Sequence, residues 1–157
     1  MPRKKTHYWI DGYNVIFRLK LGEGEDLERR RGELVARVAA LGGPAWIVFD
    51  TREGEGRART EWPFRRVKVQ FARAGQSADA VIAARVGAGG DLGDVVVVTD
   101  DRELAGLCRQ HGATVMGVRA FGALLKPLPE PPPKGSQPLS AEQIEEWKRY
   151  FGVEEPE

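Results

Sequence analysis

Acidic residues stand at the ends of several predicted strands, where their carboxylates could share a metal ion. They are Asp11, Asp50 and the pair Asp100 and Asp101, together with Asp79 at the start of a predicted helix. The carboxyl ends of the strands of an open α/β sheet form the crevice where ligands bind, so we expect these acids to meet at one edge. Two unit charges ~4 Å apart repel by roughly 4 kcal/mol at an effective dielectric near 20, and a divalent cation removes that repulsion. The pattern predicts a site for a hard metal ion.

Each acid also has an ordinary structural explanation. Asp11 begins an Asp-Gly turn dipeptide, and Asp50 follows a strand where Asp commonly starts a turn. Asp79 lies in the first turn of a helix, where the helix dipole favours a negative side chain. Asp101 could open a helix with Asp100 as its cap. Independent capping roles would not require all these acids at one edge of the sheet, so a shared metal site is the preferred interpretation.

The residue types indicate which metal this site would bind. Carboxylates without His or Cys favour Mg²⁺ or Mn²⁺, which keep several waters and bridge to substrate phosphates. His7 precedes the first predicted strand and His111 ends a helix, so we expect both to be structural or solvated. Cys108 belongs to an apolar helix stripe and is expected in the core. No Ser-His-Asp arrangement competes with the metal site.

Strands and helices alternate along the chain, which predicts an α/β fold. Predicted strands cover 7–10, 46–49, 66–71, 95–98 and 113–118, and predicted helices cover 27–41, 77–86 and 104–111, with a short helical turn at 120–125. The clean polar–apolar alternation of 66–71 is typical of a half-exposed edge strand. Residues 11–14 are predicted as a turn, and the Glu/Arg-rich run 28–33 is expected to face water for the most part.

Bulk properties limit the class of protein. The 157 residues suffice for one domain with an appendage, and the net charge of +1 makes no global case for nucleic acid. A single cysteine excludes an internal disulfide, and no apolar run approaches the ~20 residues of a membrane span, so we expect a soluble cytoplasmic protein. We predict a catalytic-type domain over 1–125, a Pro-rich spacer over 126–139, and a C-terminal helix and tail over 140–157.

Four short motifs together resemble the NYN domain, and most of all its YacP-like branch of bacterial endoribonucleases. The motifs are Asp-Gly-Tyr-Asn at 11–14, Val-Phe-Asp at 48–50, Ser-Ala-Asp at 77–79 and Val-Thr-Asp-Asp at 98–101. The resemblance covers about residues 7–125. It implies the PIN-like (Rossmann-like) nuclease fold: a three-layer sandwich with a mostly parallel, five-stranded sheet of order 3-2-1-4-5 between helices.

The resemblance also implies roles for individual residues. Asp11, Asp79 and Asp101 would be metal ligands, and Asn14 would orient Asp11 or contact a phosphate. Asp50 is a candidate for an outer or second-metal position. Two further candidates are Asp100, at a position that is not usually acidic in the family, and Glu103, which matches an auxiliary acid of PIN-type sites.

A basic arm follows the second strand and could attract a polyanion to the acids. Its candidate RNA-binding residues are Arg52, Arg57, Arg59, Trp62, Arg65, Arg66 and Lys68. Trp62 could stack on unpaired bases, with roughly 1–3 kcal/mol for each base. The alternative is a solvated loop with Trp62 packed against the core.

These observations predict a metal-dependent endoribonuclease that cleaves single-stranded RNA. A ribosome is a further predicted partner, since YacP-like nucleases are thought to act there. Two alternatives stay open: a non-catalytic RNA- or ribosome-binding module, and a DNA-directed nuclease or phosphoesterase of the same fold. The first has no need of clustered carboxylates near a polyanion, whereas the sequence does not show whether a 2′-hydroxyl is recognised.

Overall fold

One parallel sheet organises the chain. The computed structural model describes residues 6–51, 64–73 and 75–125, so the predicted spacer, the predicted C-terminal helix and Arg52, Arg57, Arg59 and Trp62 lie outside the described residues. The elements are β1 (His7–Asp11), α1 (Gly12–Leu19), α2 (Leu27–Ala39), β2 (Ala45–Phe49), β3 (Val67–Phe71), α3 (Ala78–Gly87), β4 (Val95–Val98), α4 (Arg102–Gln110), β5 (Thr114–Met116) and α5 (Val118–Leu124). The strand order is β3-β2-β1-β4-β5 and every pairing is parallel. The predicted α/β fold and strand order are confirmed.

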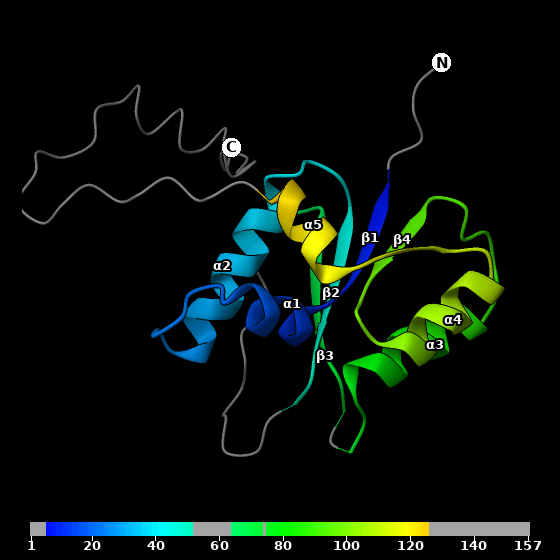
Figure 1. The fold of residues 1–157 in the computed structure, drawn as a ribbon, viewed down its shortest axis with the longest axis horizontal. Helices are drawn as coiled ribbons and strands as arrows, with labels where there is room; N and C mark the ends of the chain where they lie inside the picture. Colours follow the sequence, from blue (N-terminus) through cyan, green and yellow to red (C-terminus); the bar gives the residue numbers. More distant parts are fainter. Residues whose placement is uncertain (1–5, 52–63, 74, 126–157) are drawn as a thin grey trace, which may run out of the picture.

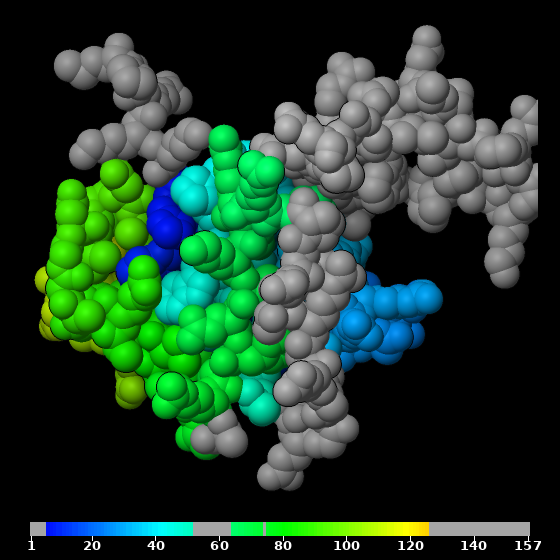
Figure 2. Space-filling view, turned by 180° about the vertical axis from the view of Figure 1, so that it is seen from behind, coloured from blue at the N-terminus to red at the C-terminus, as the bar shows by residue number. Residues whose placement is uncertain are grey.

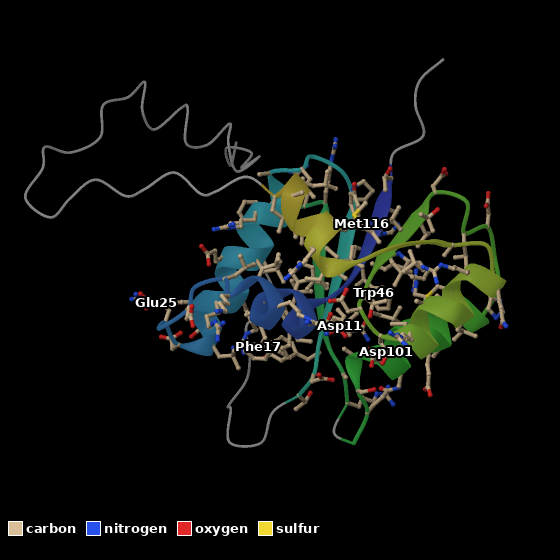
Figure 3. The ribbon with its side chains drawn as sticks, in the orientation of Figure 1. Asp11, Phe17, Glu25, Trp46, Asp101 and Met116 are labelled. Carbon is tan, nitrogen blue, oxygen red and sulfur yellow. The ribbon has the colours of Figure 1, made fainter. Side chains whose placement is uncertain are left out.

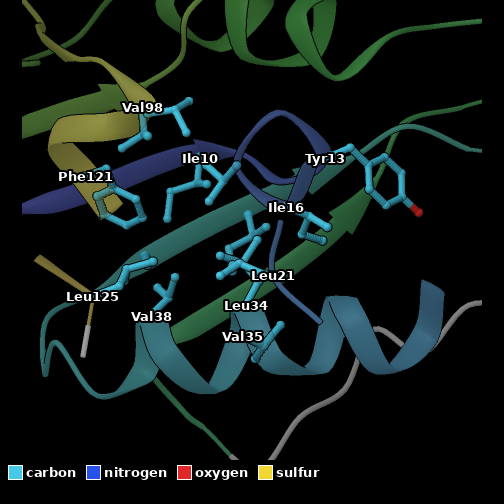
Figure 4. Packing of buried hydrophobic residues seen from close by; sticks show 14 of the residues in the cluster. Ile10, Tyr13, Ile16, Leu21, Leu34, Val35, Val38, Val98, Phe121 and Leu125 are labelled. Carbon is cyan, nitrogen blue, oxygen red and sulfur yellow. The ribbon is translucent and has the colours of Figure 1, made fainter. Parts of the chain in front are cut away.

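Helices cover both faces of this sheet, as a parallel sheet requires. Helices α1, α2 and α5 lie on one face, and α3 and α4 on the other (Figure 1). Successive residues of a strand point to opposite faces, so Ile10 packs with α2 and α5 (Figure 4) while Trp9 packs on the α3 and α4 side. In strand β3 at the edge, exposed residues alternate with buried or partly buried ones, which confirms the predicted half-exposed edge strand. In the part of the chain that the structure describes, no helix is long and apolar enough to cross a membrane.

The predicted turn at 11–14 is wrong, because α1 begins there directly. Asp11 is the last residue of β1 and also the residue that precedes the helix, with φ −76° and ψ 100°. Gly12 serves close packing rather than a turn. A Cβ atom at this position would lie 2.3 Å from Cε1 of Phe49, whose side chain is fully buried. The absence of a side chain at Gly12 therefore lets α1 start immediately behind the acid.

Replacing Gly12 by Ala is expected to lower the free energy of unfolding by about 1–3 kcal/mol, the usual effect of overpacking a core. Phe49 or the start of α1 must move to make room, and α1 carries Asn14. Urea titration checks the stability change. Gly106→Ala in α4 is the matched control, because no atom lies within 4 Å of the added Cβ and Ala is the better helix former. Equal stability of Gly12→Ala and Gly106→Ala would contradict the packing role.

Three smaller predictions also differ from the structure. The fifth strand covers only Thr114–Met116, and Val118 already begins α5, two residues earlier than predicted. Arg31, in the run expected to face water, is only 4% exposed, with Nη1 donating to the Tyr13 hydroxyl at 2.9 Å. Its guanidinium also lies 5.4 Å from the centre of the Phe71 ring. The aliphatic stem and the planar head of Arg can be buried when such partners exist.

Candidate active site

Asp11 is a buried acid at the carboxyl end of the central strand. Its side chain is only 8% exposed. The pKa of Asp11 is raised to about 8, mainly by burial and also by a hydrogen bond with the Asp79 carboxyl group and the charges of Asp79 and Asp50. The backbone amide of Asn14 acts in the opposite direction and lowers the pKa. Without a cation, Asp11 therefore keeps its proton at neutral pH.

Asp79 comes to Asp11 from the first turn of α3. Ser77 caps this helix by accepting a hydrogen bond from the Ala80 N–H at 3.1 Å, so the predicted helix start is confirmed. Oδ1 of Asp79 is buried, and no described residue forms a hydrogen bond with it. A buried carboxylate oxygen without a partner is unfavourable. The Asp11–Asp79 pair thus holds a proton that a divalent cation could replace, and it leaves one carboxylate oxygen of Asp79 unused as a ligand atom.

Asp50 links the end of β2 to the start of α3. Its Oδ1 accepts a hydrogen bond from the Ala78 N–H at 2.6 Å. This bond satisfies one of the free amides of the helix end and holds α3 against the strand ends. The same carboxylate contributes to the raised pKa of Asp11, so it lies within electrostatic reach of the acidic pair.

Asp100 is engaged in holding helices together. Its Oδ1 accepts from the Val118 N–H at 3.0 Å, and its Oδ2 forms an ion pair with Arg18 Nε at 3.1 Å. Its backbone N–H donates to Oδ1 of Asn14 at 3.4 Å. Asp100 therefore connects α1, the start of α5 and the end of β4. The link to α1 includes Asn14, whose side-chain oxygen accepts the hydrogen bond from the Asp100 N–H.

Asp101, rather than Asp100, caps α4, which corrects the predicted cap. Oδ1 of Asp101 accepts from the Leu104 N–H at 2.8 Å, and the Asp101 N–H donates to Thr99 Oγ1 at 3.0 Å. Figure 3 labels Asp101 and Asp11 at the same end of the sheet. Glu103 lies in the first turn of α4 with its side chain exposed.

The predicted ligands are thus only partly brought together. The charges of Asp79 and Asp50 both act on Asp11, whereas Asp101 uses one carboxylate oxygen to cap α4. Among residues 6–51, 64–73 and 75–125, no group of three or more His, Cys, Asp or Glu side chains is arranged to hold one metal ion. Mg²⁺ commonly binds through one or two carboxylates with waters and substrate phosphates, so the Asp11–Asp79 pair still fits such an ion.

An open groove of about 420 Å³ gives access to this site. Its lining residues are Asp11, Tyr13, Asn14, Phe17, Arg18 and Asp50. Tyr13 and Phe17 were not identified as site residues from the sequence. Their rings stack with centroids 5.6 Å apart, and Phe17 is 40% exposed. The i, i+4 spacing after Gly12 could have placed both on one face of a helix, had the helix been predicted there.

The described part of the basic arm lies away from the acids. Arg65 and Arg66 precede β3 and Lys68 is its second residue, so all three lie toward the amino ends of the strands with their side chains exposed. Arg66 Nη1 donates to the Gly42 carbonyl oxygen at 2.6 Å. These cations approach the molecule at a different part of the sheet from Asp11.

Comparisons with known proteins support the same fold. The crystal structure of Rae1 (YacP) from Bacillus subtilis matches with a TM-score of 0.60 and 25% sequence identity, over 74% of this chain and 71% of that chain. The structure of its W164L mutant matches with a TM-score of 0.58 and 23% identity, over 76% and 74% of the two chains. No curated protein sequence matches this chain. The sequence pattern of the YacP-like NYN domain, a nuclease-type family, matches residues 8–151. The chain therefore belongs to the YacP-like NYN domain family.

Proposed function

We propose that this protein is a metal-dependent endoribonuclease that hydrolyses phosphodiester bonds of single-stranded RNA. The observation that carries the proposal is the pair of buried Asp11 and partly buried Asp79 beside an open groove at the carboxyl edge of the sheet. One carboxylate oxygen of Asp79 has no described partner. Ligands of α/β proteins bind at this edge. Membership of a nuclease-type family supports the same chemistry.

Asp11 and Asp79 would hold Mg²⁺ or Mn²⁺, with Asp101 as the proposed third ligand and Asp50 and Glu103 as outer acids. When bound, such an ion activates a water molecule and neutralises charge on the phosphodiester. Asp101 uses Oδ1 to cap α4, so its proposed ligand atom is Oδ2. Asp100 has an interaction at each carboxylate oxygen, and we assign it to positioning Asn14 and Arg18 rather than to the metal.

The chain's own groups would orient the substrate in the groove. Phe17 offers a partly exposed aromatic ring at the groove, stacked on Tyr13 and with the Arg30 guanidinium 5.0 Å from its centre. An unpaired base could pack against its exposed part. Arg18 is 66% exposed and also lines the groove, so its guanidinium can attract a phosphate while Asp100 holds its position. Acids and a cation thus line one groove, as the cleavage of a polyanion requires.

A non-catalytic binding module is less well supported, since a buried pair of carboxylates near a polyanion opposes binding unless a cation is present. A ribosome partner and a cytoplasmic location stay predictions. The predicted C-terminal helix and tail at 140–157 lie outside the described residues.

A cleavage assay tests the proposal and the choice of nucleic acid. Labelled single-stranded RNA and the matching DNA are incubated with protein in Mg²⁺, Mn²⁺ or EDTA. We expect internal cleavage of RNA in either metal and none in EDTA. Cleavage that persists in EDTA would exclude the metal mechanism. Cleavage of DNA alone would instead favour a DNA-directed nuclease.

A further inference from the structure

A second groove of about 530 Å³ lies on the sheet face that carries α3, toward the amino halves of the strands. It crosses three adjacent strands, because Trp9 of β1 pairs with Trp46 of β2, and Trp46 pairs with Lys68 of β3. Arg85 of α3 forms part of its wall. Figure 2 shows this face: blue atoms of β1 and cyan atoms of β2 lie at the surface between the green segments.

This groove carries positive charge from several elements. The cations that line it are Arg65, Arg66, Lys68 and Arg85, and none of the described lining residues is acidic. Burial lowers the pKa of His7 in the same lining, and the charges of Arg85 and Lys68 lower it further. The first groove, by contrast, is lined by two acids.

The tryptophans of the groove show an unused donor. Trp9 is only 4% exposed, and its buried Nε1 has no hydrogen-bond partner among the described residues. Nε1 of Trp46, by contrast, donates to Gln70 Oε1 at 3.0 Å. An unsatisfied buried donor in a native structure calls for an explanation. Because this Nε1 is buried, Trp9 contributes its ring rather than a donor to the groove.

Arg85 links the two tryptophans to the positive charge. Its guanidinium lies 5.5 Å from the centre of the Trp9 ring and 5.3 Å from that of Trp46. The two rings meet edge to face with centroids 5.5 Å apart. Stacking on aromatic rings restricts the guanidinium while leaving its N–H groups able to donate to an anion.

We propose that this groove binds the phosphodiester backbone of single-stranded RNA outside the cleaved linkage. The proposal rests on the proposed function, since it adds a second contact to the same substrate. Cations with adjacent aromatic rings are typical of binding to single strands without base specificity. Trp9 and Asp11 are two residues apart and point to the same face, so the groove and the acidic pair are separated by only ~7 Å along β1.

Binding in EDTA tests the groove without any need for cleavage. We expect Lys68→Gln/Arg85→Gln to bind a labelled single-stranded RNA of about 16 nucleotides roughly tenfold more weakly than the unmodified protein. Two lost phosphate contacts should also reduce the slope of log affinity against log salt by about 1.4. Fluorescence anisotropy measures both quantities. Lys68→Gln alone, on the exposed edge strand, should give about half of the change in slope and keeps the test valid if the double variant does not fold.

The control is Arg109→Gln/Arg119→Gln, which removes the same charge from exposed positions of α4 and α5. It should bind RNA as the unmodified protein does. An equal loss in both double variants, or no loss in either, would overturn the groove proposal. Binding of polyglutamate but not RNA, lost in Lys68→Gln/Arg85→Gln, would overturn it in favour of an acidic protein partner. If the unmodified protein binds RNA in this manner but cleaves none in Mn²⁺, the proposed function fails while the groove stands.

Discussion

Replacing Asp11 by Asn is expected to lower RNA cleavage in Mn²⁺ by about a hundredfold or more. Loss of one group that stabilises developing charge has effects of this order, and Asp11 is the proposed ligand at the centre of the acidic pair. The amide has almost the same shape as the carboxyl group and can donate a hydrogen bond to Asp79, as protonated Asp11 does. The fold should therefore survive. Single-turnover cleavage of labelled RNA measures the loss.

Two comparisons make this result specific. Asp79→Asn should cause a loss of similar size, because it removes the other half of the pair. Glu23→Gln changes the net charge equally at an exposed position and should cleave RNA like the unmodified protein. Cleavage by Asp11→Asn within threefold of the unmodified rate would show that the acidic pair does not support catalysis.

The acids at the strand ends could be predicted because their placement follows from local signals. A buried β-branched run ends at Val98, and Asp100 and Asp101 come soon after it, so any parallel arrangement puts them at the carboxyl edge. Serine is a common residue at the N-cap of a helix, and Ser77 caps α3 in the structure. The strand order was implied by resemblance, and the structure confirms it.

Two features of the site depend on contacts between distant segments, which local sequence patterns do not show. Asp-Gly favours a turn locally, but Gly12 packs against Phe49, far along the chain, and α1 starts instead. Asp100 was a metal candidate from its place beside Asp101, and the structure adds that its carboxylate oxygens contact the Val118 N–H and Arg18 Nε. Contacts between residues far apart in the chain cannot be predicted from the spacing of residues within one short segment. Tyr13 and Phe17 line the groove from α1. They were not predicted as site residues, because the Asp-Gly dipeptide indicated a turn where α1 begins.

The raised pKa of Asp11 predicts how the stability of the metal-free protein depends on pH. The ordinary pKa of this carboxyl group is 3.8, and in the folded chain it is about 8. Between these values the folded state binds one more proton than the unfolded state, so stability falls as the pH rises. The contribution is fully present below about pH 4 and is lost by about pH 8. The expected decrease is on the order of a few kcal/mol.

Asp11→Asn isolates the titration of the acidic pair, since groups away from this pair titrate equally in both proteins. In EDTA the variant should be more stable than the unmodified protein at pH 8, and the difference should shrink toward pH 4. Urea unfolding at a series of pH values measures it. Mn²⁺ must displace the proton of Asp11, so its affinity for the unmodified protein should increase from pH 6 to pH 8, and its binding should restore the stability lost in EDTA. Parallel stability curves for the two proteins would mean that Asp11 is ionised normally and needs no cation. A gain in stability that is matched by a loss of cleavage would instead identify Asp11 as a residue kept for catalysis at the expense of the fold.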